Sequence, residues 1–178
     1  MAERIQISEQ DRARAIELLG REPRTPFSIK TRCCDGSPQV LLADPVFVED
    51  ERWKPFPTFL WLVCPELKLK VAHLEEKGLV RQFSEKLVSN ESFRENFTRG
   101  CHEISEIRVR MAEEIMAEEV PESILTILSE TTIAGSFDIK GVKCLHAHLA
   151  QELAFGNNPI GREILAMIGI CRHERKTQ

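Results

Sequence analysis

The stretch TFLWLVCPELKLKVAHLEEKG, residues 58–78, separates a part of the chain that predicts strands from a part that predicts helices. Its first seven residues are a short, continuous run of mostly apolar side chains, which is typical of a strand buried on both faces. Pro65 ends this run and suits the first turn of a helix, whose apolar positions then repeat at helical spacing up to Gly78. We therefore expect a strand to lead directly into a helix, with Cys64 at the junction.

The residues before this stretch predict one helix followed by a hairpin. Ser8 is a good N-cap and Gly20 suits the residue after a helix. Two short strand-like runs then flank a turn of Asp-Gly followed by Ser-Pro. The expected elements are a helix over 9–19 and strands over 27–33 and 39–43. Residues 44–57 contain three prolines and predict an irregular loop, with a strand at 46–48 at most.

The residues after this stretch predict helices only. Apolar side chains recur at three- and four-residue steps, and Asn90 can cap the longest helix. Gly100 lies inside that helix at some cost in helix stability. The expected helices cover about 80–88, 90–115, 122–130, 142–155 and 161–170, with a loop over 131–141.

The order of these elements predicts an α+β fold. A small, mostly antiparallel sheet from the first third of the chain should pack with six or seven helices. At 178 residues the chain is expected to form one domain, residues 1–178. Its charged tail, residues 171–178, is expected to fray.

Composition narrows the classes of function. The net charge of −4 argues against a nucleic-acid partner, because phosphate binding favours a basic surface. The first residues lack the apolar run of a signal peptide, and the longest apolar segment is too short to cross a membrane. We therefore expect a cytoplasmic protein with reduced cysteines. The sequence leaves open whether its partner is a small molecule or a protein, and what its oligomeric state is.

Several short motifs occur together over roughly residues 10–162. They are Arg32-Cys33 with Gly36 and Pro38, Phe56-Pro57-Thr58, Cys64-Pro65, Leu74-Glu75, His102-Glu103, Lys143-Cys144-Leu145-His146, and Asn158-Pro159 with Gly161. Their combination resembles the uncharacterised DUF 501 family of bacterial proteins. The chain departs from that family in its longer stretch from about 104 to 137 and in the spacing around Cys33 and Cys34. The resemblance implies a bacterial origin and supplies no activity.

The stretch GVKCLHAHLAQELAFGNNPIGR, residues 141–162, is the densest in groups able to do chemistry. On a helix over 142–155, His146 should point inward, whereas Cys144 and His148 share another face. Cys144 and His146 can bind one metal ion together only if Cys144 still belongs to the preceding loop. Cys144 with His148 is the alternative pair. His146 is alternatively a core histidine that is hydrogen-bonded to a carbonyl.

The turn that follows has two interpretations. Asn157, Asn158 and Pro159 suit a helix–helix turn, in which Asn tolerates a left-handed conformation and Pro begins the next helix. Alternatively, Asn157, Asn158 and Arg162 bind an anion at the N-terminus of that helix.

Cys64 carries the second chemical signal. A thiol at a helix N-terminus is stabilised as a thiolate, so Cys64 is a buried core residue, a metal ligand or a nucleophile. The chain lacks the CxxC spacing of a standard zinc ribbon. Dispersed ligands for zinc or an iron–sulfur cluster are nevertheless available. The candidate metal ligands are Cys33, Cys64, Cys144 and His146.

Three hypotheses for function follow. The first is a metal-binding protein that uses the four candidate ligands. The second is a metal-free thiol enzyme with Cys64 as nucleophile and His146 as base. His102 is a further catalytic candidate, although a solvated helix face with i,i+4 pairs is the favoured explanation of the His102-Glu103 pair. The third is a non-catalytic interaction module. We treat the remaining thiols and imidazoles as background: His73, Cys101, Cys171 and His173.

Overall fold

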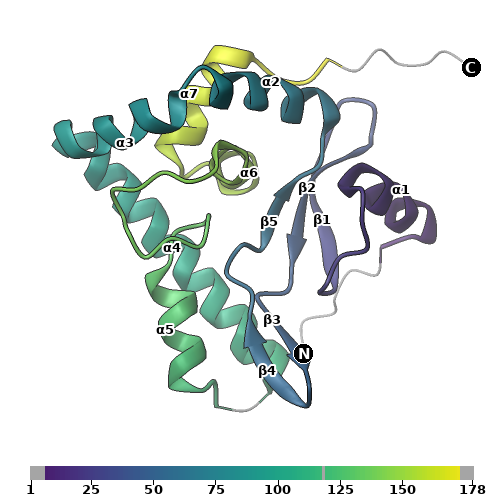
Figure 1. Cartoon of the computed structure of the whole chain (residues 1–178). Helices are drawn as coiled ribbons and strands as arrows, with labels where there is room; N and C mark the ends of the chain where they lie inside the picture. Colours follow the sequence, from purple (N-terminus) through teal and green to yellow (C-terminus); the bar gives the residue numbers. More distant parts are fainter. Residues whose placement is uncertain (1–6, 118, 173–178) are drawn as a thin grey trace, which may run out of the picture.

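The junction at Cys64 is where the strands end and the helices begin. Strand β5 (Leu60–Leu62) leads into helix α2 (Pro65–Glu76), with Pro65 at the start of the helix as predicted (Figure 1).

The computed structural model describes residues 7–117 and 119–172. The fold is α+β. The other elements are α1 (Glu9–Leu19), β1 (Phe27–Arg32), β2 (Pro38–Ala43), β3 (Val46–Glu49), β4 (Arg52–Pro55), α3 (Leu79–Ser89), α4 (Glu91–Met116), α5 (Glu122–Glu130), α6 (Leu145–Phe155) and α7 (Pro159–Ile168).

The main sheet has three antiparallel strands in the order β1-β2-β5. Strands β1 and β2 form the predicted hairpin, and Gly36 takes the left-handed conformation in its turn with φ of 85°. Strand β2 lies in the middle, where Val40 pairs with Leu62 of β5. This arrangement brings the turn after β1 and the end of β5 to the same end of the sheet.

The strand expected at 46–48 is present as β3, but the prediction of an irregular loop over the rest of 44–57 is wrong, because this segment forms a second antiparallel hairpin. Strands β3 and β4 pair from Val46 with Pro55 to Glu49 with Arg52. The turn places Asp50 and Glu51 at positive φ, a conformation that gives a two-residue hairpin turn. The hairpin accommodates the three prolines of this segment because they lie outside the strands or at a strand end.

Capping explains where several helices begin. Ser8 accepts a hydrogen bond from the Asp11 N–H, and Asn90 accepts one from the Phe93 N–H, so the predicted starts of α1 and α4 are confirmed. Helix α7 begins at Pro159 and not at 161, because the Asn158 side chain caps it by accepting from the Gly161 N–H. Helix α6 begins at Leu145 and not at 142, because Cys144 is still extended, with φ of −146°.

Helix α6 lies at the centre of the helical part, surrounded by α2, α4, α7 and the sheet (Figure 1). Its middle is buried almost all round, from Ala147 to Gln151. The opposite face of the sheet packs against α1, where Ala15, Leu41 and Val63 form a smaller core. A third apolar cluster joins β3 with the end of α4 and with α5. The main core therefore lies between the sheet and the helices that surround α6.

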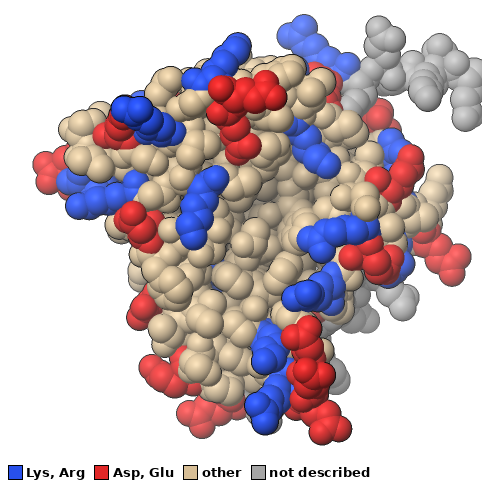
Figure 2. Space-filling view, in the orientation of Figure 1, with Lys and Arg blue, Asp and Glu red and all other residues tan. Residues whose placement is uncertain are grey.

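Charged side chains of both signs lie side by side around the rim of the face in Figure 2, and the middle of that face is uncharged. Within the described part of the chain, no helix combines the length and the apolar character needed to cross a membrane.

Candidate functional site: two clusters of metal-type ligands

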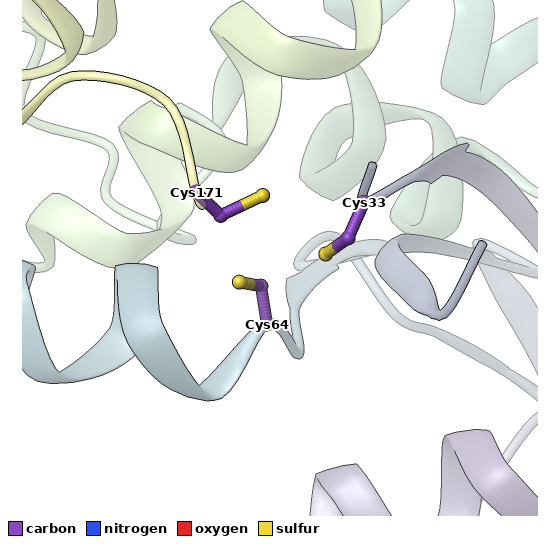
Figure 3. Close-up of side chains that lie close together, drawn as sticks. All are labelled: Cys33, Cys64 and Cys171. Atoms are coloured by element: carbon purple, nitrogen blue, oxygen red, sulfur yellow. The ribbon is translucent and has the colours of Figure 1, made fainter. Parts of the chain in front are cut away.

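The first cluster consists of the thiols of Cys33, Cys64 and Cys171, which we call the three-cysteine cluster. Their sulfur atoms all lie within 4.8 Å of one another, and all three residues are buried. Figure 3 shows the three thiols pointing toward a common point from three separate segments. Such convergence of sulfur atoms is the arrangement that a thiolate-bound metal ion requires.

The sheet positions two of these cysteines. Cys33 directly follows β1, and its N–H donates to the Ser37 carbonyl across the hairpin turn at 2.9 Å. Cys64 follows β5, where the Gln39 carbonyl accepts from the Val63 N–H at 2.9 Å and from the Cys64 N–H at 3.4 Å. Because β2 pairs with both strands, it holds the two thiols at the same end of the sheet.

The third cysteine comes from the segment after α7. Cys171 is only 4% exposed, so the expectation that the tail frays is wrong at this residue. The rest of the expected frayed tail, residues 173–178 with His173, lies outside the described residues. The Gln39 amide donates to Cys171 Sγ at 3.3 Å. The Arg172 N–H donates to a Glu66 oxygen at 2.8 Å, which fixes the segment against α2.

The surroundings of Cys33 and Cys171 raise the pKa of both thiols. Contact with Cys64 is the main cause that raises the pKa of Cys33 well above its ordinary value, and burial adds to it. Burial is the main cause that raises the pKa of Cys171. Three thiolates in one buried place repel one another, so a cation is the natural way to gather them in ionised form.

The second cluster consists of Glu75, Cys144 and His146, and its ligand atoms also lie within 4.8 Å of one another. His146 Nδ1 lies 3.3 Å from Glu75 Oε1 and 4.0 Å from Cys144 Sγ. The other ring nitrogen, Nε2, lies 3.1 Å from the carbonyl oxygen of Lys68. Unlike the three-cysteine cluster, this one is partly exposed, with 26% of the His146 side chain and 29% of the Glu75 side chain accessible.

Two helix ends build the second cluster. Cys144 is the last extended residue before α6 and so belongs to the preceding loop. This is the arrangement that Cys144 and His146 need in order to bind one metal ion together. Glu75 lies in the last turn of α2, and its Oε1 accepts a hydrogen bond from the Leu145 N–H at 2.7 Å. The carboxylate thus ties the end of α2 to the start of α6.

The two ionisable groups at the start of α6 shift each other's pKa. Burial disfavours the Cys144 thiolate, but the hydrogen bond from His146 and the backbone N–H of Ala147 outweigh it, so the pKa of Cys144 lies below its ordinary value. The hydrogen bond with Cys144 is the main cause that raises the pKa of His146, against burial and with help from the charge of Glu75.

The four predicted metal ligands are therefore divided between two clusters. Cys33 and Cys64 belong to the first, whereas Cys144 and His146 belong to the second. The sulfur near His146 is that of Cys144, and Cys64, the predicted nucleophile, is fully buried. His102 is exposed on α4 and lies near Glu106, outside both clusters.

The sequence assigned the buried face of α6 incorrectly. His148 is 1% exposed, whereas His146, which was expected to point inward, is partly accessible. The later start of α6 and its position between the sheet and three helices explain the error, because an almost fully buried helix has no single apolar face.

The predicted anion-binding residues all have partners within the protein. Asn158 is fully buried, and its amide donates to His148 and Gln151. Asn157 donates to Glu103, and Arg162 donates to Glu152. These contacts join α7 to α6 and α4, and they account for the three side chains without an anion.

Sequence reasoning missed Glu75 and Cys171 as members of the clusters. Glu75 lies four residues after the buried Val71 and shares its face of α2, so an inward-facing acid could have been recognised. Cys171 carries no comparable signal, since only tertiary packing places a residue beyond the last helix.

A family model described as "Protein of unknown function (DUF501)" matches residues 29–166. The chain belongs to this family. The DUF501 match includes every member of the two clusters except Cys171. The resemblance expected from the sequence is thus confirmed. No curated protein and no solved structure matches the chain.

Proposed function

We propose that the protein binds one metal ion through the thiolates of Cys33, Cys64 and Cys171. The observation that supports this proposal is the convergence of three buried sulfur atoms within 4.8 Å of one another. Sulfur ligands of a tetrahedral zinc ion lie about 3.8 Å apart, given a Zn–S distance of about 2.3 Å. Small side-chain movements would therefore bring the three sulfurs onto one ion.

The spacing favours a single ion over an iron–sulfur cluster. In a four-iron cluster each cysteine binds a different iron, so the sulfur ligands must be spread more widely than around one ion. Thiolate sets select zinc or copper(I) among common biological metals. We therefore expect zinc or copper(I) here.

The burial of the three cysteines favours a structural role. Such an ion would join the β1–β2 turn, the start of α2 and the segment after α7, which are far apart in the sequence. We also propose a cytoplasmic location in bacteria, because thiols remain reduced and available for a metal in the cytoplasm.

Metal analysis with a count of sulfur ligands tests the proposal. Untagged Cys144→Ser protein, which lacks the sulfur of the second cluster, should contain a metal after purification without oxygen, and the X-ray absorption of that metal should show three sulfur ligands. Cys33→Ser, Cys64→Ser and Cys171→Ser should each remove it. Cys34→Ser and Cys101→Ser are matched controls that should retain it, because neither thiol belongs to the cluster. Absence of a sulfur-bound metal from the wild-type protein would contradict the proposal.

A further inference from the structure

We infer that Glu75, Cys144 and His146 form a second metal site, which takes a zinc-type divalent ion and leaves a coordination position open to solvent. The site uses none of the ligands of the three-cysteine cluster, so this inference does not rest on the function proposed above.

The hydrogen bond of His146 to Lys68 fixes which ring nitrogen is available. A carbonyl oxygen only accepts, so Nε2 carries the proton that it donates to the Lys68 carbonyl at 3.1 Å. In the neutral ring, the lone pair of Nδ1 then faces the other two members of the cluster, and a metal ion there takes the place of the proton that Nδ1 otherwise shares with Cys144 and Glu75. Metal-bound histidines commonly donate their second ring N–H to a backbone carbonyl, as here.

The atoms that face Nδ1 are acceptors as well. Glu75 Oε1 lies 3.3 Å away, and Cys144 Sγ lies 4.0 Å away. An acceptor that faces a carboxylate oxygen at this distance requires a proton or a cation between the two. A metal ion satisfies all three ligand atoms at once, whereas a proton on Nδ1 is shared between only two partners.

The distances fit a tetrahedral zinc ion closely. With the usual metal–ligand distances, an imidazole nitrogen and a carboxylate oxygen on one zinc ion lie about 3.4 Å apart, and nitrogen and sulfur lie about 3.6 Å apart. The observed 3.3 Å and 4.0 Å require only the thiol to move, by a few tenths of an ångström. The Leu145 N–H holds the carboxylate in place at 2.7 Å.

The exposure of the cluster leaves room for a fourth ligand. About a quarter of each of the His146 and Glu75 side chains is accessible, in contrast to the buried three-cysteine cluster. Three protein ligands of mixed type with an accessible fourth position are typical of zinc sites that hold an exchangeable water molecule. The protein would then hold a closed, all-sulfur site and an open, mixed-ligand site.

Titration of reduced, metal-free protein with Zn²⁺ and Co²⁺ against a chromophoric chelator tests the inference. Cys144→Ser and His146→Gln should each lose one equivalent of metal, and that equivalent should survive in Cys171→Ser. In Cys171→Ser, bound Co²⁺ should show the charge-transfer absorption of a single thiolate. His73→Gln, an exposed histidine on α2, is the control and should lose nothing. If neither Cys144→Ser nor His146→Gln changes the metal content, the inference is wrong.

Nitrogen-15 spectra of the wild-type imidazoles provide a test without mutation. With saturating Zn²⁺, His146 should keep its proton on Nε2 and carry none on Nδ1. A proton that remains on Nδ1 under these conditions would show that a protonated imidazole, and not a metal, bridges Glu75 and Cys144. If Cys144→Ser and His146→Gln each lose one equivalent of metal but Cys171→Ser loses none, only the function proposed for the three-cysteine cluster is contradicted.

Discussion

Gly161 of α7 packs directly against the backbone of His148 in α6. A Cβ atom at position 161 would lie 2.3 Å from the His148 carbonyl oxygen and 2.6 Å from Glu152 Cβ. Helices α6 and α7 can therefore approach this closely only because residue 161 has no side chain.

Gly161→Ala should destabilise the protein, because the backbone atoms that it meets cannot move aside as a flexible side chain would. Overpacking of this kind costs about 1–3 kcal/mol in free energy of unfolding. Urea unfolding measures the loss, and Met167→Ala, an exposed position on the same helix, is the control. A change below roughly 0.5 kcal/mol, the size of an ordinary surface substitution, would show that the two helices separate easily.

Arg108 of α4 is fully buried, and its guanidinium donates to the Pro57 carbonyl at 3.0 Å and to the carbonyls of Thr131 and Thr132. Burial lowers the pKa of Arg108 to about 10, so the group remains charged at neutral pH.

Arg108→Lys should destabilise the protein by about 1–3 kcal/mol, because an ammonium cannot span all of these carbonyls and leaves at least one buried acceptor unpaired. Thermal and urea unfolding measure the effect. The exposed Arg110→Lys should be neutral by comparison. Equal stability of the two variants would mean that the fold does not need a guanidinium that bonds several carbonyls at once.

His148 makes the stability of the fold depend on pH. Burial lowers its pKa to about 4, from an ordinary value near 6.5. The unfolded chain therefore binds a proton that the folded chain does not, and stability falls as the pH drops from about 6.5 to about 4.

His148→Gln should make unfolding of the chelator-treated protein less sensitive to pH across this window. The wild-type loss due to His148 amounts to at most about 3.4 kcal/mol, for a pKa that falls from 6.5 to about 4 at 1.36 kcal/mol per pKa unit. Urea unfolding between pH 7 and 4 measures it, with the exposed His73→Gln as control. Identical pH profiles for His148→Gln and the wild type would contradict this role.

Gln39 should support the proposed metal in the three-cysteine cluster. Its side-chain amide nitrogen donates to Cys171 Sγ at 3.3 Å, and its side-chain oxygen Oε1 accepts from the Thr31 hydroxyl at 3.0 Å. Loss of such an outer hydrogen bond commonly weakens metal binding 10- to 100-fold, so we expect a decrease of about that size for Gln39→Met. Competition with a chelator measures the affinity. The exposed Gln82→Met should bind like the wild type.

Metal removal should release the segment after α7. The Arg172 N–H, bonded to Glu66, should lose hydrogen-exchange protection when the metal is chelated or when Cys171 is changed to Ser. Cys101→Ser, on α4 and outside the cluster, should leave the protection unchanged. Protection that persists in chelated protein would mean that Glu66 and Gln39 suffice to hold the segment.

Local sequence signals predicted most of the elements. Caps at Ser8 and Asn90 and the proline at position 65 located three helix starts, since each acts on backbone groups within one turn. The start of α6 was missed because Cys144 lacks a capping hydrogen bond. The β3–β4 hairpin was missed because its turn residues, Asp50 and Glu51, are unusual at positive φ.

The sequence by itself determined the α+β class, the order of most of the elements and the types of chemical group available, because these depend on periodicity and on residue identity. Only the tertiary structure decided which groups meet. It separated Cys33 and Cys64 from Cys144 and His146, brought in Cys171 and Glu75, and buried His148 in place of His146. Side chains that converge from distant segments depend on how strands pair and helices pack, and the spacing of residues along a chain does not record those distances.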